Sequence, residues 1–170
     1  DNWKEQIIDF IDKSNVIIEN VNFGTAHKTR NFINNYIREK IPQAEYVGRL
    51  DADDYLVDNF VISKIEQIID SNNPDIILAG NKLSINNEII ERINRANPLL
   101  LENDFLKDKL FKMSNGIAEG ELPSCNTFIK PSVLINYPEI ESAEDHWFTV
   151  KLLLNKYKYK IFVSPDLLYS

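Results

Sequence analysis

Short apolar runs alternate with helical segments over the first half of this chain, and this alternation constrains the fold strongly. The runs at 45–51 and 75–80 are typical of largely buried strands. The segments at 26–40 and 58–71 carry apolar residues at helical spacing, and Asn72-Asn73-Pro74 ends the second one. Strands that alternate with helices indicate a parallel sheet with crossover helices. The sequence therefore predicts an α/β domain.

The remainder of the chain is less regular but also divides into helices and strands. Further helices are expected at Trp3–Lys13, at Glu102–Lys112 and at Ser142–Lys156, with a helical turn at Pro131-Ser132. Further strands are expected at 16–18, 82–86, 124–130, 160–163 and 167–169. Thr25 is the expected N-cap of the helix at 26–40, and residues 113–122, with two glycines, are expected to form a mobile loop.

An acidic segment, Asp51-Ala52-Asp53-Asp54, follows the first buried run. Three carboxylates within four residues repel one another unless a cation lies between them. On an extended backbone, Asp51 and Asp53 point to the same side. Hard cations such as Mg²⁺ and Mn²⁺ prefer oxygen ligands and keep positions open for water and phosphate. The segment indicates a metal site that binds a diphosphate, although Asp clusters are also common in turns.

A second acidic motif, Glu144-Asp145, opens the predicted helix at Ser142–Lys156. Ser142 and Asp145 have the spacing of a capping box, and acidic residues in a first turn suit the helix dipole. Alternatively, one of these carboxylates is a general base, kept ionised by the helix N-terminus. His146 and Trp147 would then supply a hydrogen-bonding group and a stacking face for a sugar. Sequence order leaves open whether the two acidic motifs share one site.

Composition narrows the class of protein. The 170 residues suit one domain, and 44% hydrophobic and 26% charged residues are globular values. A net charge of −7 argues against nucleic acid as a partner. The sequence lacks an apolar run of about 18 residues, and its one cysteine, Cys125, fits a reducing compartment. We therefore expect a cytoplasmic protein.

Three stretches, taken in order, resemble the family 2 glycosyltransferases, which are inverting enzymes of GT-A fold. Residues 22–31 are similar to the family's glycine followed by an Arg-Asn pair, here Arg30-Asn31. Residues 44–56 contain Arg49 and the acidic segment, which resembles the metal-binding DXD signature. Glu144-Asp145, followed by His146, Trp147 and Phe148, resembles the family's ED motif. The match runs from about Asn15 to Phe162.

The resemblance implies a role for each matching position. Asp53 would be the main ligand of Mn²⁺ or Mg²⁺, with help from Asp51. The donor, expected to be a UDP-sugar, would meet Asp51, Asp54, Arg30 and Arg49. Asp145 would be the base that deprotonates the acceptor hydroxyl, and Glu144, His146 and Trp147 would bind the acceptor. The acceptor class is a carbohydrate or a lipid-linked saccharide, and the expected setting is surface polysaccharide synthesis at the inner face of the membrane.

One part of the family pattern has no counterpart. The family opens with a strand, a helix and a second strand, whereas residues 1–14 look like the helix that would follow this unit. We therefore expect residues 1–170 to form one partial, N-terminally truncated GT-A-like (Rossmann-like) domain with a mixed, mostly parallel sheet flanked by helices. The strand edges left uncovered would permit a homo-oligomer.

Two other functions stay open at this point. A truncated relative could keep the fold as a non-catalytic binding module. A metal-dependent nucleotidyltransferase or phosphohydrolase could use the same acidic segment, although the Glu144-Asp145 helix favours a glycosyltransferase. Residues 113–123 are the candidate acceptor lid, because they contain glycines and lack periodicity.

Overall fold

The computed structural model describes residues 17–51, 54–85, 88–94, 96–117, 122, 127–140 and 142–169. The helices are α2 (Ala26–Lys40), α3 (Val61–Asn72), α4 (Asn103–Ser114) and α5 (Glu144–Leu154), with 3₁₀ turns η1 (Pro98–Leu101) and η3 (Pro131–Val133). The strands are β1 (Val47–Gly48), β2 (Ile76–Ile85), β3 (Glu88–Asn94), β4 (Thr127–Ile129) and β5 (Ile161–Tyr169). Among the described helices, none has the length and hydrophobicity needed to cross a bilayer.

The five strands form one mixed sheet. Its order is β1-β4-β2-β3, and β5 pairs with β2. Within the described residues, β5 runs parallel to β2, whereas the β1–β4, β4–β2 and β2–β3 pairings are antiparallel. The expected mixed α/β sheet is confirmed, but parallel pairing does not dominate these described strands. One reason is that β3 follows β2 after two residues, and so short a connection joins antiparallel strands.

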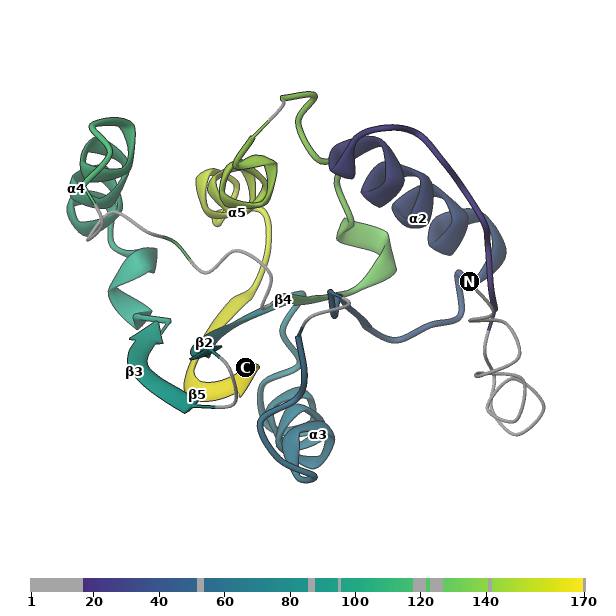
Figure 1. Cartoon of the computed structure of the whole chain (residues 1–170). Helices are drawn as coiled ribbons and strands as arrows, with labels where there is room; N and C mark the ends of the chain where they lie inside the picture. Colours follow the sequence, from purple (N-terminus) through teal and green to yellow (C-terminus); the bar gives the residue numbers. More distant parts are fainter. Residues whose placement is uncertain are drawn as a thin grey trace.

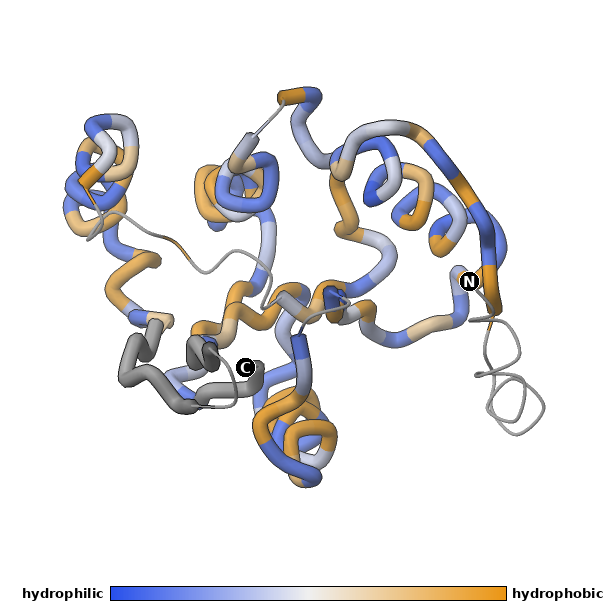
Figure 2. The backbone as a smooth tube through the Cα atoms, viewed as in Figure 1, coloured by the Kyte–Doolittle hydropathy of each residue, from blue (hydrophilic) through white to orange (hydrophobic). Residues whose placement is uncertain are grey.

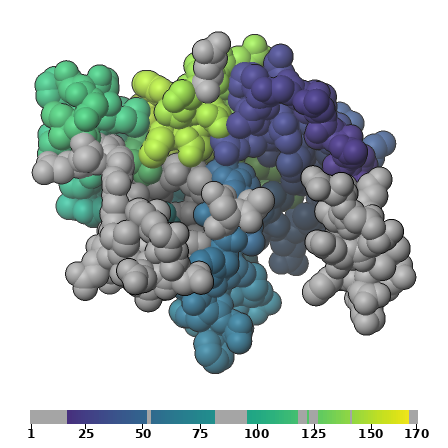
Figure 3. All heavy atoms as spheres, in the orientation of Figure 1, coloured from purple at the N-terminus to yellow at the C-terminus, as the bar shows by residue number. Residues whose placement is uncertain are grey.

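Helices cover both faces of the sheet. In Figure 1, α2, α4 and α5 lie on one side of the strands and α3 lies on the other. Figure 3 shows the same division on the surface, where α2, α5 and α4 adjoin one another and α3 projects away from them. The sheet is therefore the middle layer of three.

The central strand β2 contributes side chains to a hydrophobic core on each face of the sheet. Ile76 and Leu78 join the larger core, which includes Phe148 of α5. Ile77 joins the smaller core, which includes Val61 of α3. This alternation is the two-residue period of an extended strand with both faces buried. In Figure 2 the central strands accordingly appear as hydrophobic runs.

Several predicted elements differ from the observed ones. Residues 17 and 18, predicted as strand, have no regular structure, and Ile17 lines an apolar groove on α2 instead. The strand at 45–51 shortens to β1, the runs at 75–80 and 82–86 merge into β2, and the last two strands merge into β5. β3 was not expected. The predicted helix Trp3–Lys13 lies outside the described residues.

Four polar residues of α2 bind the backbone of residues 134–140, here called the strap. Asn34 Nδ2 donates to the Ile135 carbonyl at 2.9 Å, and Arg38 Nη1 donates to the Leu134 carbonyl at 2.8 Å. At the other end, His27 Nδ1 lies 3.1 Å from the Ile140 carbonyl oxygen. The fourth residue is Asn31, whose contacts are described below. Extended backbone needs hydrogen-bond partners, and one face of α2 supplies them here. The strap leads towards the start of α5, so α2 helps to position that helix.

Candidate functional site

Arg30 on α2 connects the two acidic motifs. Its Nη2 lies 3.5 Å from Asp51 Oδ2, and its Nη1 donates to Glu144 Oε1. The side chains of Arg30 and Glu144 are only 18% and 11% exposed, so solvent screens this ion pair weakly. Asp51 and Glu144, one residue from each acidic motif, therefore lie on either side of the same arginine, a proximity that sequence order alone left open.

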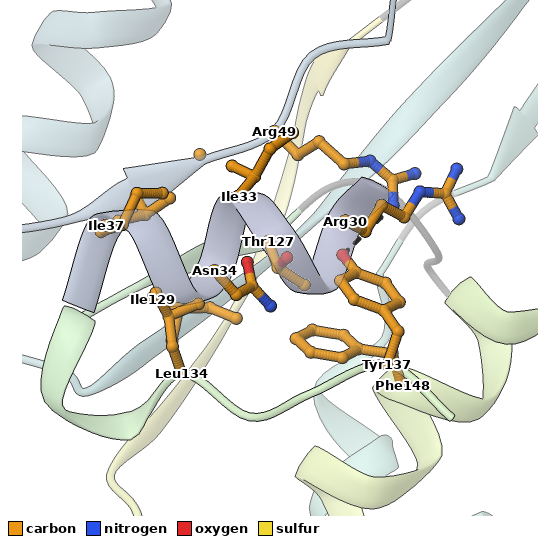
Figure 4. Close-up of a pocket in the computed structure, with 12 residues that line it drawn as sticks. Arg30, Ile33, Asn34, Ile37, Arg49, Thr127, Ile129, Leu134, Tyr137 and Phe148 are labelled. Carbon is orange, nitrogen blue, oxygen red and sulfur yellow. Dashed lines mark hydrogen bonds between the residues drawn. The ribbon is translucent and has the colours of Figure 1, made fainter. Parts of the chain in front are cut away.

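A second arginine reaches the same carboxylate. Arg49 Nη2 lies 3.1 Å from Asp51 Oδ2, and Arg49 Nη1 donates to the Tyr137 hydroxyl at 3.2 Å. Figure 4 shows Arg30 and Arg49 extending to the same side of the site, with the Tyr137 ring close to both. Asp51 thus lies between two guanidinium groups. Guanidinium groups gathered in this way suit an anionic ligand that binds through several oxygens.

Tyr137, which lies on the strap, was not predicted as a site residue. The guanidinium carbons of Arg30 and Arg49 lie 5.5 and 5.8 Å from the centre of its ring. The ring also stacks on Phe148 of α5, with ring centres 4.2 Å apart. Asn31 fixes its backbone, since Asn31 Nδ2 donates to the Tyr137 carbonyl at 3.1 Å and Tyr137 N donates to Asn31 Oδ1 at 2.6 Å. The sequence signal that could have indicated Tyr137 as a site residue is its position shortly before the Glu144-Asp145 motif.

Glu144 and Asp145 occupy the first turn of α5. The helix begins at Glu144 and its N-cap is Ala143, so Ser142 is not the cap residue that the capping-box interpretation requires. Asp145 Oδ1 accepts a hydrogen bond from the backbone N–H of His146 at 2.8 Å. The partial positive charge of the helix N-terminus stabilises two negative charges here. The two carboxylates differ in setting, because Glu144 is buried against Arg30 and Asp145 is half-buried.

A groove lies between the end of α4 and the start of α5, which carries these carboxylates. It is lined by Ala143, His146 and Trp147 of the α5 start and by Met113, Ser114, Gly116 and Ile117 at the end of α4. Trp147 is 43% exposed. The Nδ1 atom of His146 is buried and has no hydrogen-bond partner among the described residues. Of the candidate lid at 113–123, the structure describes residues 113–117 and Leu122, which is fully buried. Residues 118–121 and 123 lie outside the described residues.

The predicted metal ligands are described only in part. Asp53 lies outside the described residues. Asp54 is described, and its backbone N–H donates to the Asp51 carbonyl at 3.1 Å. The part of the chain that the structure covers contains no cluster of three or more His, Cys, Asp or Glu residues arranged to hold a metal. Carboxylate oxygens are nevertheless the donors that Mg²⁺ and Mn²⁺ prefer, so the residue types fit such an ion.

Comparison with known proteins adds evidence on the fold. No protein-family model matches the sequence, and no curated protein matches it. Crystal structures of Staphylococcus aureus TarS do match. The structure of TarS 1-349 with UDP has a TM-score of 0.66 and 22% identity over 99% of this chain and 47% of that chain. The structure with UDP-GlcNAc has a TM-score of 0.66 and 22% identity, over 99% of this chain and 45% of that one.

This chain has a GT-A fold. A longer TarS structure matches with the same TM-score of 0.66 and 22% identity, over 99% of this chain but only 28% of that chain. The chain therefore spans about half of the shorter TarS chains and 28% of the longer one. The GT-A prediction is confirmed, while assignment to family 2 and the role of each site residue stay predictions.

Proposed function

We propose that this GT-A domain belongs to a metal-dependent, inverting glycosyltransferase. It transfers a sugar from a UDP-sugar to a hydroxyl of a carbohydrate or lipid-linked saccharide. The observation that carries this proposal is Arg30, which contacts both Asp51 and Glu144 and so unites the donor and acceptor motifs. The matched TarS structures, which contain UDP and UDP-GlcNAc, support a uridine nucleotide as the donor.

The donor half of the site consists of Arg30, Arg49, Asp51, Asp53 and Asp54. The two guanidinium groups bind diphosphate oxygens and stabilise the charge that develops on the leaving UDP. Asp53, with Asp51, would hold Mn²⁺ or Mg²⁺, which when bound neutralises charge on the diphosphate. Asp51 also holds the two arginines close together, as the structure shows. Asp54, whose backbone N–H donates to the Asp51 carbonyl, would contact the sugar.

The acceptor half of the site consists of Asp145 and the groove beside it. Asp145 accepts the proton of the acceptor hydroxyl as the hydroxyl oxygen attacks the anomeric carbon. The new bond forms opposite the departing UDP, so configuration inverts and no covalent enzyme intermediate is required. Glu144, which is paired with Arg30, positions the start of α5. Trp147 and His146 supply a stacking face and a hydrogen-bonding group for the acceptor sugar.

Calorimetric titration with UDP, with and without Mn²⁺, tests the donor half. We expect Mn²⁺-dependent binding by the wild-type chain, and loss of that metal dependence in Asp53→Asn. Asp58→Asn is the matched control, because Asp58 lies outside the acidic segment and pairs with Lys64. A folded wild-type chain that does not bind UDP, or an Asp53→Asn variant that binds like the wild type, would contradict the proposal.

A transfer assay tests the acceptor half. Asp145→Asn should abolish sugar transfer to an acceptor identified by screening, while UDP affinity stays near the wild-type value. Sugar transfer by Asp145→Asn at the wild-type rate would show that Asp145 is not the base. UDP-sugar hydrolysis that never yields a glycosylated product would favour a phosphohydrolase or a binding module. The setting in surface polysaccharide synthesis and a homo-oligomeric state stay predictions.

A further inference from the structure

Tyr137 contacts two arginines and a phenylalanine through its ring, and its backbone is hydrogen-bonded by Asn31. Arg30 comes from α2 and Arg49 follows β1, and both guanidinium groups lie within 6 Å of the ring centre. Phe148 of α5 stacks on the same ring. The Tyr137 ring therefore contacts side chains from α2, α5 and the segment after β1, which makes it suited to fixing their relative positions.

Arg30 and Arg49 share the Asp51 carboxylate, and Glu144 pairs with Arg30. Arg30 and Arg49 approach the same Oδ2 atom of Asp51, so their positive charges repel each other. The negative face of an aromatic ring attracts both cations. The Tyr137 hydroxyl adds a hydrogen bond from Arg49 Nη1. Ring and hydroxyl together counteract the repulsion and restrict two long, flexible side chains.

The ring is itself held firmly. Asn31 binds both the N–H and the carbonyl of Tyr137, so one amide side chain fixes the backbone on both sides of the Cα atom. Tyr137 is 7% exposed, and it belongs to the same core as Phe148. A rigid ring therefore faces two arginines whose own backbones lie on different elements.

We infer that Tyr137 is a positioning residue that orients Arg30 and Arg49 towards a diphosphate ligand. The diphosphate part of this inference rests on the proposed function, whereas the ordering of the arginines does not. Removal of the ring would leave Arg30 with its two carboxylates and Arg49 with Asp51, and both guanidinium groups would gain freedom of orientation. Donor affinity would fall because binding would then have to order both side chains.

Two variants separate the contributions of ring and hydroxyl. Tyr137→Phe keeps the ring and removes the hydrogen bond from Arg49. Tyr137→Leu removes the ring but leaves a hydrophobic side chain against Phe148. Tyr46→Phe is the matched control, because it also removes one tyrosine hydroxyl, and the Tyr46 hydroxyl donates to the Pro74 carbonyl. Thermal unfolding of every variant reports how much structure each change costs.

Nuclear magnetic resonance of the arginine Nε–Hε groups tests the ordering without any ligand. Assignments come from Arg30→Lys and Arg49→Lys. We expect ordered Nε–Hε groups for both arginines in the wild type, in Tyr46→Phe and, for Arg30, in Tyr137→Phe. In Tyr137→Leu both signals should show fast motion, and in Tyr137→Phe only Arg49 should loosen. Equal order in the wild type and Tyr137→Leu would overturn the inference.

Calorimetry with UDP and Mn²⁺ tests the consequence for the donor. We expect Tyr137→Leu to weaken UDP about tenfold and Tyr137→Phe about threefold, in line with the strength of cation–π contacts and one hydrogen bond. Tyr46→Phe should leave the Kd unchanged even though it lowers the unfolding temperature. A wild type that fails to bind UDP would contradict the proposed function, and the resonance experiment would still decide the role of Tyr137. Unchanged affinity in a folded Tyr137→Leu would overturn the link to the donor.

Discussion

Arg30 and Glu144 form an ion pair although 114 positions separate them in sequence. The pair links the first turns of α2 to the first turn of α5, and it is mostly buried. A buried pair is costly to break from one side, because the remaining charge loses its partner. The contact therefore ties the geometry of the proposed base to that of the donor site.

A double-mutant cycle measures this coupling. Arg30→Met and Glu144→Gln should each lower the free energy of unfolding by about 2 kcal/mol. The double variant should lose less than the sum, because neither charge is then left without its partner. Urea denaturation provides the three values. Strictly additive losses would show that the two side chains do not interact in solution.

Asn31 should matter more than its surface neighbour Asn35. Asn31→Leu removes both hydrogen bonds to Tyr137 and should cost about 2 kcal/mol of unfolding free energy. Asn35→Leu, on the exposed face of the same helix, removes one exposed hydrogen bond from Arg38 Nη2 and should cost under about 0.5 kcal/mol. Chemical denaturation compares the two variants directly. Similar losses of unfolding free energy in the two variants would mean that the Asn31 hydrogen bonds to Tyr137 do not stabilise the fold.

Gly48 leaves room for the Phe128 ring. A Cβ atom at position 48 would lie 2.6 Å from Phe128 Cε1, so Gly48→Ala should cost about 1–3 kcal/mol through overpacking. Combination with Phe128→Leu should recover part of that cost, because the smaller side chain vacates the position. Urea unfolding of the single and double variants tests this. Absence of any recovery would point to a backbone effect instead.

Asp75 should give the chain a specific acid sensitivity. Its Oδ2 accepts from the Lys160 backbone N–H at 2.9 Å and its Oδ1 lies 3.2 Å from Lys130 Nζ. The hydrogen bond from Lys160 and then the Lys130 ammonium hold the pKa of the Asp75 carboxyl below its usual range. A carboxyl with a lowered folded-state pKa stabilises the fold above its unfolded-state pKa, and this stability is lost as pH falls through the folded-state value.

Asp75→Asn should therefore be less stable than the wild type at pH 7. The difference should begin to shrink below about pH 4, the unfolded-state pKa, and should be lost as the pH falls through the lower folded-state pKa, where the folded carboxyl becomes protonated. Urea unfolding at several pH values measures this difference. The control is Asp104→Asn, whose side chain is fully exposed and should show little change at any pH. A constant difference for Asp75→Asn would contradict the assigned interaction.

Trp147 should affect the acceptor and not the donor. Trp147→Ala removes the exposed ring from the groove and should raise the acceptor KM about tenfold, while the Kd for UDP stays constant. Tyr157→Ala removes another exposed ring, 80% accessible and just beyond the other end of α5, and should leave both values unchanged. Steady-state kinetics with a fixed donor tests this. If Trp147→Ala weakened donor and acceptor binding equally, a specific role of Trp147 in acceptor binding would be contradicted.

Local patterns in the sequence predicted much of this fold, because helical spacing and capping act over few residues. The helix at 26–40 was predicted with the bounds that α2 shows, and Thr25 is its N-cap position. β3 was missed because its isoleucines, at positions 89, 90 and 93, do not follow the two-residue alternation that predicts a strand. The pair Asn86-Asn87 between two such runs was a hairpin signal that could have revealed it.

The residue types of the candidate site were predictable, but their contacts were not. Arg30, Asp51 and Glu144 were singled out from motifs, yet nothing local shows that one arginine reaches both carboxylates. Tyr137 was missed because its role depends on the strap, an irregular segment whose path is set by side chains of α2. The position of Asp53 lies outside the described residues, so its metal role stays a prediction.

The side-chain bonds from α2 to the strap have a consequence for mutational tolerance. Asn31, Asn34 and Arg38 bind main-chain atoms, which every amino acid supplies. Apart from Asn136, whose side chain accepts a hydrogen bond from Arg38 Nη2 at 2.8 Å, exposed strap positions should therefore accept substitutions more readily in a saturation library than these three helix positions do. A one-residue insertion in the strap should be the most damaging change, because it would shift the spacing between Tyr137 and the start of α5. The information that fixes this irregular segment is thus stored in a helix about 100 residues earlier in the chain.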